Sequence, residues 1–445
     1  MMCSLNDGCN KIFKDSNTKD ALIINVNNSK CRKCLIQDGH VVLRKKDVYC
    51  KDCFIPMVIH KFRATLGKSK LVKQGENVMI CVSGSQCSIS LLHLIWSGLQ
   101  QTTHKRLTFT PVVLHIDETV LFGYSKERFI QFKELFESYN LPYYIISFSS
   151  ALYSENVLDE DCYLQKYDKK LKSLFNSKFD LTLKQDILIR LRKLAIIRIA
   201  RALNCTRVMT AENEQKLSIK LLSNVALGRG SQIGNEIGLA INNKSINTSI
   251  VFLRPLRDLS AKEVSFYALF NQLNDLEHPN FLTKTNEDES IQKISEQFIN
   301  SLQEEFPSTI STIFRTGEKI VEKTTIDNTC VICNGIMDTD MPLSSSVEAT
   351  RFSKYVSQMG VNAVEANLND LNLKKKLRES CCNEDCNCSN EKFTKQDIIN
   401  CLCYGCQHIV QNLDSVDDLP DEIIKICKEN LADKSMKKQI KDFLL

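Results

Sequence analysis

Short apolar runs alternate with amphipathic segments through the middle of the chain. The run Val78–Val82 ends in a small polar loop, and the segment from Ser88 to Leu99 has the length and the periodicity of a helix. Strands alternating with helices predict an α/β fold with a doubly wound parallel sheet. The ligand crevice of such a sheet lies at the carboxyl ends of its strands, which is where this loop would lie. Further strands are predicted at 109–116, 143–148, 206–210 and 251–253, and further helices at 126–139, at 184–203 and from 215 onward.

Two stretches lack this alternation. Residues 151–180 are polar and charged without a clean period, and residues 376–395 are interpreted as a surface insertion. Neither stretch predicts a regular element, and no internal repeat of the solenoid type is visible.

The composition is that of an ordinary globular protein, with 43% hydrophobic and 25% charged residues in 445. No apolar run approaches the ~18 residues that span a bilayer. The N-terminal segment has neither the basic nor the apolar region of a secretory signal, so a cytoplasmic location without membrane partners is expected. The net charge of +5 permits a polyanionic partner without requiring one.

Cysteine is the one residue type that departs from average usage. The chain has 20 cysteines, with six in residues 1–66, four in 67–325 and ten in 326–427. In a chain without a secretory signal, such density favours metal binding over disulfides. This distribution predicts an N-terminal zinc module (1–66), a central α/β domain (67–325), and a C-terminal cysteine-rich zinc module with a helical tail (326–445).

The first cysteine cluster has the spacing of a structural zinc site. Cys31 and Cys34 form one C-x2-C pair, and fifteen residues separate them from Cys50 and Cys53. Two such pairs match a tetrahedral four-thiolate site, which leaves no open position for a substrate. The alternative is four unliganded cysteines in a small core, but the segment has few apolar residues to fold around.

A second pairing is predicted near the other end of the chain. Cys330 and Cys333 form one pair, and Cys403 and Cys406 form another, 69 residues further on. Because that separation is long, a second zinc site rests on the two pairs alone, and a different cluster stays open. The competing cysteines are Cys381, Cys382, Cys386, Cys388 and Cys401.

Two basic segments are candidate contacts for RNA phosphates. The predicted helix 184–203 carries basic residues against a single acid, Asp186, and is either an RNA contact or a solvated face. The basic group after the first cysteine cluster is favoured, since zinc knuckles often deliver basic residues to RNA. A basic turn at 228–230 either reaches phosphate or is a simple turn. The candidates are Lys61, Arg63, Lys68 and Lys70 with Lys73, then Arg190 and Lys193 in the helix, and Arg229 in the turn.

The loop Ser83-Gly84-Ser85-Gln86-Cys87-Ser88 is of the kind that binds phosphate through backbone N–H groups. Alone, it also fits a plain turn with Ser88 as the helix cap. It resembles a degraded form of the Ser-Gly-Gly-x-Asp-Ser loop of the PP-loop ATP pyrophosphatases. A vestigial phosphate site would use Ser83, Gly84, Ser85 and Ser88.

Motifs between about residues 31 and 410 resemble one family, the cytoplasmic tRNA 2-thiolation protein 2 family. They are Cys50-Lys-Asp-Cys-Phe54, His60-Lys-Phe-Arg-Ala-Thr-Leu-Gly-Lys68, the loop itself, Leu222-Ser-Asn-Val-Ala-Leu-Gly-Arg-Gly230, Arg254-Pro-Leu-Arg257 and Leu402-Cys-Tyr-Gly-Cys406.

The resemblance implies a partner and a reaction. Family members pair with a catalytic subunit, cytoplasmic tRNA 2-thiolation protein 1. The complex places sulfur on C2 of the wobble uridine in lysine, glutamine and glutamate tRNAs. ATP activates the uridine by adenylation, and a thiocarboxylated ubiquitin-related modifier supplies the sulfur.

Departures from the active pattern predict that this subunit is not the catalyst. Ser85 replaces the second loop glycine and Cys87 replaces the aspartate, which removes a carboxylate that orients magnesium or nucleotide. The run 211–216 corresponds to Gly-His-Asn-Ala-Asp-Asp, and only Asn213 of that motif survives. Ser83, Gly84 and Ser88 of the loop are retained, which leaves a weakened phosphate site, but ATP is not predicted as a cofactor.

The sulfur-carrying cysteines of active relatives are also missing. Residues 179–186 hold no cysteine, and none follows Arg254 before Cys330. Cys205 is either a substitute sulfur carrier or a buried thiol.

Three functions therefore compete. The favoured one is a non-catalytic, tRNA-binding scaffold subunit, and the alternatives are an active tRNA sulfurtransferase or a zinc-dependent RNA-binding module outside thiolation.

Overall fold

The computed structural model describes residues 29–43, 47–102, 106–152, 164–176, 179–245, 248–276, 281, 290–320, 329–335, 337, 394–413 and 415–440. Six of the strands in these ranges form one sheet in the order β5-β4-β3-β6-β8-β7. Five of them are parallel, and β7 pairs antiparallel with β8 at one edge. The strands are β3 (Asn77–Cys81), β4 (Thr110–Asp117), β5 (Tyr143–Ser147), β6 (Arg207–Met209), β7 (Ala240–Ser245) and β8 (Thr248–Leu253).

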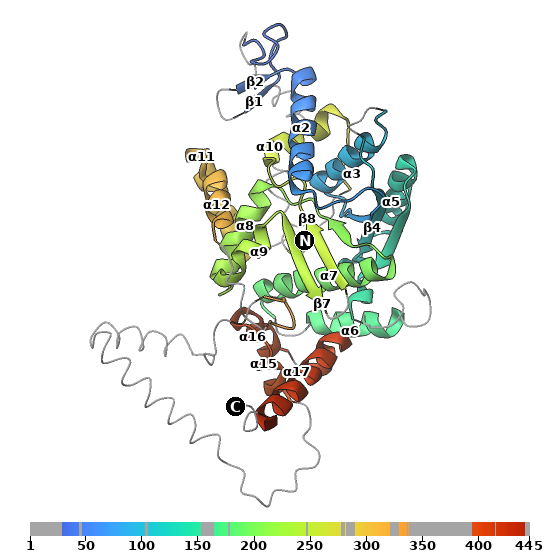
Figure 1. Ribbon diagram of the computed structural model, residues 1–445, viewed down its shortest axis with the longest axis vertical. Coiled ribbons are helices and arrows are strands. Elements are labelled where there is room, and N and C mark those ends of the chain that lie inside the picture. The colour runs from blue at the N-terminus through green and yellow to red at the C-terminus, as the bar shows by residue number, and fades with distance from the viewer. Residues whose placement is uncertain are drawn as a thin grey trace, which may run out of the picture.

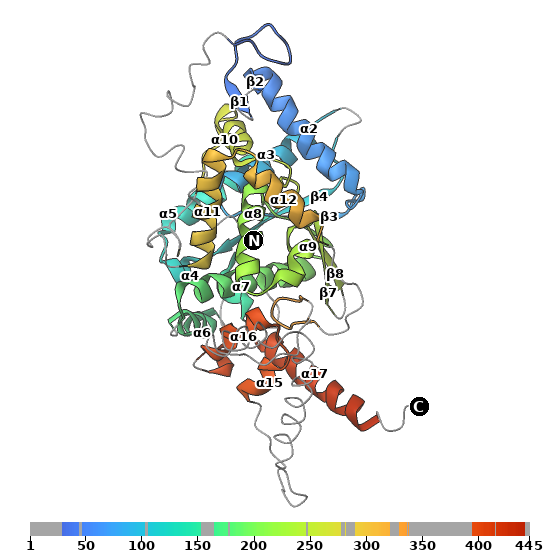
Figure 2. The same ribbon diagram turned by 90° about the vertical axis from the view of Figure 1, so that its left-hand side faces the viewer.

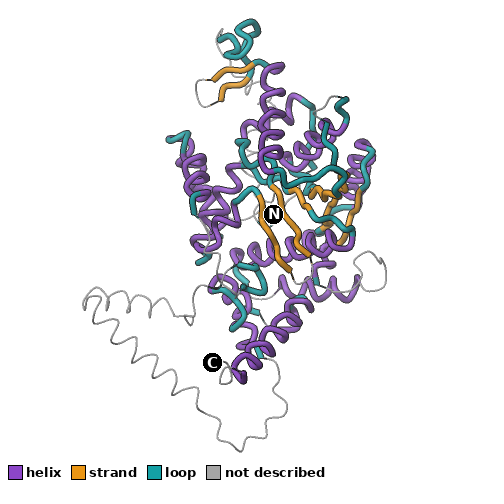
Figure 3. The backbone as a smooth tube through the Cα atoms, viewed as in Figure 1, coloured by secondary structure: helices purple, strands orange, loops and turns teal. Residues whose placement is uncertain are grey.

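The strand order places a topological switch point beside the central strand β3. The chain runs from β3 outward through β4 to β5, and then returns to add β6 and β8 on the other side of β3. The loops that follow β3 and β6 therefore diverge at the carboxyl edge of the sheet, where ligands bind in open α/β folds. Figure 3 shows the strands in the centre of the molecule, with helices around them.

Both faces of the sheet are buried, which is why β3 is almost continuously apolar. Val78 and Ile80 face one hydrophobic cluster, while Met79 and Cys81 face the other, as the two-residue period of a strand requires. The first face packs against α2 (Lys51–Ser69), α3 (Gln86–Leu99), α5 (Lys126–Tyr139) and α10 (Ala261–Phe270). The second face packs against α6 (Leu164–Asn176), α7 (Leu181–Ala202) and the C-terminal segment.

A smaller helical group covers the side of the sheet near β8. Its core consists of Leu217, Leu221, Ile233, Ile237 and Phe314. In Figure 1 these helices form a separate layer at the left of the molecule. They are α8 (Glu214–Ala226), α9 (Ile233–Ile237), α11 (Ile291–Glu305) and α12 (Thr309–Glu318).

The two cysteine-rich segments lie at opposite ends of the long axis (Figures 1 and 2). The N-terminal end carries the antiparallel hairpin of β1 (Val41–Leu43) and β2 (Asp47–Tyr49), from which α2 leads into the α/β domain. The C-terminal end carries α15 (Lys395–Ile399), α16 (Tyr404–Gln411) and α17 (Asp421–Ile440). Short connecting helices are α4 (Thr119–Phe122), η1 (Phe148–Ala151), η2 (Gly230–Gln232) and η3 (Val416–Asp418).

The predicted doubly wound α/β fold is confirmed, and its strands and helices begin and end within a few residues of the expected positions. The elements that were not predicted include the edge strand β7 and helix α6 inside the stretch 151–180, as well as the hairpin of β1 and β2 and the helices α2, α10, α11 and α12. The expected insertion at 376–395 lies almost entirely outside the described residues. Among the described helices, none combines the length and hydropathy needed to cross a bilayer.

Candidate metal centres and the phosphate loop

The N-terminal cysteines converge as the spacing predicts. The Sγ atoms of Cys31, Cys34, Cys50 and Cys53 all lie within 4.8 Å of one another, and those of Cys34 and Cys50 are 3.9 Å apart. The first pair forms a tight turn, in which Leu35 donates its N–H to the Cys31 carbonyl at 2.8 Å and adopts a φ of 59°. The second pair begins α2, with Cys50 as the N-cap residue.

The C-terminal quartet repeats this construction. Cys330, Cys333, Cys403 and Cys406 also have all four Sγ atoms within 4.8 Å of one another, and all four side chains are buried. Asn334 donates its N–H to the Cys330 carbonyl at 2.8 Å and has a φ of 58°, as Leu35 does in the first turn. Cys403 is the N-cap of α16. In both quartets a helix N-terminus stabilises the thiolates of its pair.

These distances fit one metal ion. A tetrahedral zinc with Zn–S bonds of ~2.3 Å holds its sulfurs about 3.8 Å apart, close to the 3.9 Å and 3.6 Å found for Cys34–Cys50 and Cys333–Cys403. A four-iron cluster spreads its thiolates around a cube of iron and sulfide and needs them further apart. The quartets therefore suit a mononuclear, closed site. Cys401 lies outside the C-terminal quartet and is hydrogen-bonded to Cys427, whereas Cys381, Cys382, Cys386 and Cys388 fall outside the described residues.

Two motifs that are far apart in sequence meet at the C-terminal quartet. The turn that follows α8 holds Arg229, whose Nη2 lies 3.5 Å from Cys406 Sγ. A Cβ at Gly405 would lie 2.6 Å from the Leu227 carbonyl oxygen and 2.9 Å from Arg229 Nε, so only glycine permits this approach. Gly228, with a φ of 72°, packs just as closely against Tyr404. The cysteine knuckle is thus docked directly on the α/β domain.

Polar groups of the α/β domain surround the same quartet. The Gln232 side-chain amide lies 3.5 Å from Cys333 Sγ, and the Gly335 N–H donates to that sulfur at 3.4 Å. No role around a metal centre was predicted for Gln232, Asp186 or Glu236 from the sequence. The one sequence feature that pointed to this region was Arg229, a charged residue between two glycines.

A buried ionic network extends from this quartet to the sheet. Arg229 donates two hydrogen bonds to Asp186, at 3.0 and 2.5 Å, and Arg190 lies between Asp186 and Glu236 at 3.4 and 3.5 Å. Lys220 contacts Glu236 at 2.6 Å. Glu212 completes the chain of contacts by pairing with both Lys220 and Arg254.

The network has an excess of positive charge. Its members in the described part of the chain are four cations against three carboxylates, and Lys193 acts on Glu236 as a further cation. Burial alone would raise the pKa of the Glu212 carboxyl, but Arg254 and Lys220 outweigh it and lower the pKa to about 2. A divalent ion with four thiolates carries two net negative charges, so this excess suits a metal-loaded quartet.

The burial of Arg190 and Arg229 corrects their expected role as RNA contacts. Their exposed fractions are 4% and 1%, and both guanidinium groups are held by carboxylates inside the protein. Lys193 is half-buried, and burial lowers its pKa. The remaining arginines of α7 also pair with carboxylates: Arg192 with Glu118, and both Arg198 and Arg201 with Glu422. Helix α7 is therefore an internal element rather than a solvated basic face.

The candidate RNA contacts that follow the N-terminal quartet lie on different sides of α2. Lys61 points toward α10 and pairs with Glu263 at 2.6 Å. Arg63 lies on the opposite side and donates to Gln101 at 2.8 Å. Lys70 is exposed at the C-cap of α2, with a φ of 47°. The side chain of Lys68 falls outside the described residues.

The phosphate loop is closed on itself. The helix cap of α3 is Ser85 rather than Ser88, and its hydroxyl accepts from the Ser88 N–H at 3.4 Å. Ser83 and Ser85 share a hydrogen bond at 3.1 Å, and the Ser88 hydroxyl donates to the Ser85 carbonyl at 2.8 Å. Ser85 replaces the second glycine of the active loop. Its hydroxyl thus accepts from a backbone N–H that would otherwise be available to a phosphate.

Gly84 is required by packing as well. Its φ is 91°, and a Cβ there would meet Phe132 Cζ at 2.7 Å and the Leu276 carbonyl oxygen at 2.8 Å. Leu276 also donates its N–H to the Gly84 carbonyl at 2.8 Å. The survival of this glycine is therefore explained without a nucleotide.

The loops after β3 and β6 meet, as the switch point predicts. Asn213 caps α8 by accepting from the Lys216 N–H at 2.9 Å, and its Nδ2 lies 3.7 Å from Cys87 Sγ. Cys87 is buried at the position where the active pattern has its aspartate. Burial also raises the pKa of Cys205 to about 11 and of Cys81 to about 12, which keeps both thiols protonated at neutral pH.

These features define the class of protein. A parallel sheet with a small-residue loop after its central strand, flanked by two tetracysteine knuckles, is an α/β architecture of the PP-loop type. The U34-tRNA thiolase NcsA from Methanococcus maripaludis, solved with its [4Fe-4S] cluster, matches with a TM-score of 0.53. That match covers 70% of this chain and 94% of NcsA at 19% identity, so it shows the fold alone.

Sequence comparison identifies the particular family. The model of the family described as cytoplasmic tRNA 2-thiolation protein 2 matches residues 290–408. The protein of that name from Danio rerio is 30% identical over 94% of this chain and 94% of its own length. The one from Anopheles gambiae is 32% identical over 87% of this chain and 93% of its own. The chain belongs to the cytoplasmic tRNA 2-thiolation protein 2 family.

Proposed function

We propose that this protein is the non-catalytic subunit of the cytosolic complex that 2-thiolates the wobble uridine of lysine, glutamine and glutamate tRNAs. Membership of a tRNA 2-thiolation family supports the pathway. One observation supports the non-catalytic role: at the switch point, Ser85 caps the helix and a buried Cys87 stands where the active pattern has its aspartate.

The division of labour follows from this loop. Without a carboxylate at Cys87, no group there orients magnesium on a bound nucleotide. The protonated thiols of Cys81 and Cys205 are poor sulfur carriers. Adenylation and sulfur transfer therefore belong to the partner, cytoplasmic tRNA 2-thiolation protein 1, with a thiocarboxylated ubiquitin-related modifier as sulfur donor.

Zinc is the metal that the two quartets suit best. Four thiolates at single-ion distances and closed coordination indicate a structural role. NcsA was solved with a [4Fe-4S] cluster, so the metal content of this chain is the direct check. Two equivalents of zinc and no iron are expected in the purified protein.

The pathway is tested by mass spectrometry of nucleosides from bulk tRNA of cells that lack this protein. Loss of wobble 2-thiouridine, restored by the wild-type gene, is expected. Unchanged 2-thiouridine would remove the protein from the pathway.

The non-catalytic role is tested with the purified chain. Alone, it should form neither AMP from ATP nor thiouridine in a tRNA transcript, and thiouridine should form when the partner subunit and the sulfur donor are added. A Cys87→Ala variant should support the partner as well as wild type does. Thiouridine formed by the isolated chain would show that it is an enzyme in its own right.

A further inference from the structure

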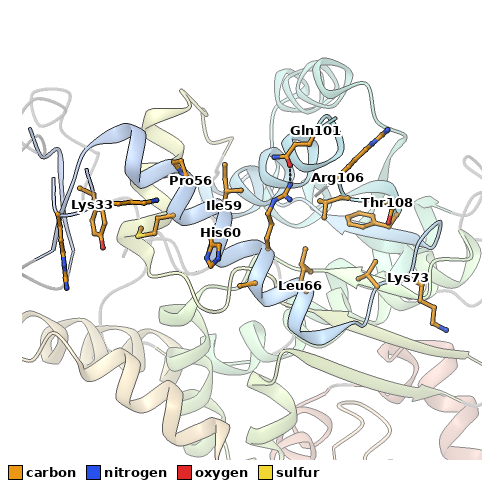
Figure 4. A pocket seen from close by; sticks show the side chains of 18 residues that line it. Lys33, Pro56, Ile59, His60, Leu66, Lys73, Gln101, Arg106 and Thr108 are labelled. Atoms are coloured by element: carbon orange, nitrogen blue, oxygen red, sulfur yellow. Dashed lines mark hydrogen bonds between the residues drawn. The ribbon is translucent and has the colours of Figure 1, made fainter. Parts of the chain in front are cut away.

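A large groove lies beside helix α2, between the N-terminal quartet and the edge of the α/β domain (Figure 4). Its volume is about 1410 Å³. Pockets for small molecules hold about 300–1,000 Å³, so this groove suits an extended ligand. The side chains of one face of α2, from Pro56 to Gly67, form one of its walls.

The rim of the groove carries basic side chains at both ends. The cations that line it are Arg32, Lys33, Arg63, Lys73 and Arg106, and no acidic residue is found among its described lining residues. Lys33 lies at the knuckle end, whereas Lys73 and Arg106 lie at the other end (Figure 4). Lys33, Lys73 and Arg106 are exposed, while Arg32 pairs with Asp47 just outside the groove.

The floor of the groove is apolar. Met57, Leu66, Val72 and Leu107 are half-buried there, and Phe109 is buried beneath them. Tyr49 of β2 and the exposed imidazole of His60 of α2 add planar side chains to the lining. An apolar floor with planar side chains and a cationic rim matches unpaired nucleotides, whose bases stack inside while their phosphates lie at the rim.

We propose that this groove binds a single-stranded segment of RNA. The inference rests on the proposed role in tRNA thiolation and gives that role a site. A double helix would reach only the rim, because its bases are paired and cannot occupy the floor. An acidic protein segment would satisfy the rim but not the planar surfaces, and the experiment distinguishes it.

Two substitutions separate the rim from the floor. Lys33→Ala with Arg106→Ala removes two rim cations from exposed positions, and Met57→Gln makes the floor polar while keeping the side-chain length. The control is Lys126→Ala with Lys169→Ala, which removes two exposed cations away from the groove. Unchanged thermal unfolding of each full-length variant verifies folding.

Binding of a fluorescent tRNA transcript to these proteins is measured by anisotropy across a range of salt concentrations. The rim variant should bind at least about tenfold more weakly, with its salt slope reduced by about 1.4, the value for two phosphate contacts on a single strand. The floor variant should weaken binding with an unchanged slope, and the control should match wild type. A single-stranded RNA about 12 nucleotides long should compete with the transcript, and its duplex should not.

Equal competition by the duplex, or wild-type binding by the rim variant, would overturn the inference. If the rim variant bound RNA normally but failed to co-purify with the partner subunit, the occupant would be protein. Failure here differs from failure of the proposed function: cells lacking the protein would still lose 2-thiouridine, and the rim variant would restore it.

Discussion

At the scale of single residues, surroundings decide the role of a charge more than its identity does. Arg229 reads in the sequence as a basic residue in a glycine turn, yet it is 1% exposed and lies between Asp186 and Cys406. Removing one member of such a buried pair leaves the other charge uncompensated, which destabilises far more than the loss of a surface pair.

Arg229→Leu should therefore lower the free energy of unfolding by about 3 kcal/mol and accelerate metal release to a chelator. Arg315, whose side chain is 64% exposed and pairs with Glu318, is the matched control. Arg315→Leu should change stability by under about 1 kcal/mol. Denaturant unfolding with a colorimetric chelator measures both effects. Equal stability of the two variants would contradict the assigned role of Arg229.

His115 makes the fold sensitive to acid. Its ring stacks on Phe132, its Nδ1 hydrogen-bonds the Val82 carbonyl oxygen at 2.8 Å, and burial lowers its pKa from 6.5 to about 4. Arg128 lowers that pKa further, while Asp117 and Glu118 oppose the shift. The unfolded chain binds a proton below about pH 6.5, but the folded protein does so only near pH 4.

Stability should thus fall between pH 6.5 and 4, by about 3 kcal/mol from this residue alone. In His115→Gln that part of the pH dependence should vanish, although the variant starts from lower stability because the stacking on Phe132 is lost. Urea unfolding at intervals across this range measures the difference, and carboxylates contribute to both proteins alike. Parallel pH curves for the two proteins would refute the buried neutral imidazole.

At the scale of elements, the periodicity of apolar residues predicted those strands and helices whose form is determined by their own local sequence. The strands of the parallel sheet and helices such as α5 were expected close to their observed bounds. Strand β7 was missed because its Ala-Ile-Asn-Asn-Lys-Ser sequence is polar, as befits an edge strand. Helix α6 was missed although Tyr167, Leu171 and Leu174 recur at helical spacing, a signal that could have found it.

Helix α7 shows that periodicity does not predict whether a charged side chain is buried. Its arginines were expected at the surface. Apart from Asp186 on the same helix, their carboxylate partners lie 46, 74 and 224 residues away in sequence, at Glu236, Glu118 and Glu422. Nothing in a local window distinguishes a buried paired arginine from a solvated one. Both cysteine quartets, by contrast, could be predicted, because each C-x2-C turn brings its two sulfurs together locally and a metal site needs two such turns.

The docking of the C-terminal knuckle on the turn after α8 depends on one small residue. In Gly405→Ala the new methyl group would meet the Leu227 carbonyl oxygen at 2.6 Å, a backbone atom that cannot move aside. We expect a loss of about 2 kcal/mol in unfolding free energy. Gly230→Ala, on the same turn, should change stability by under about 1 kcal/mol, since nothing lies within 4 Å of its Cβ. Thermal denaturation of the two variants compares them, and similar midpoints would contradict this packing.

At the scale of the whole molecule, the two quartets relate differently to the fold. Cys330, Cys333, Cys403 and Cys406 belong to the main hydrophobic cluster, together with residues of α7 such as Ile187 and Leu191. The N-terminal cysteines belong to neither sheet cluster, and Cys34 and Cys53 are only half-buried. Metal at the C-terminal quartet should therefore stabilise the α/β domain, whereas metal at the N-terminal quartet should order only the knuckle.

Single ligand substitutions separate the two roles. Cys406→Ser leaves the cationic network without its dianionic centre, so amide hydrogen exchange in α7 and α16 should accelerate by about tenfold or more. Cys34→Ser should accelerate exchange only between residues 29 and 53 and leave α7 at the wild-type rate. Each variant should lose one of two metal equivalents by elemental analysis. If Cys34→Ser accelerated exchange in α7 as strongly as Cys406→Ser, the N-terminal quartet would be part of the global fold too. If neither variant altered α7, the positive charge of the network would be balanced by some group other than the metal centre.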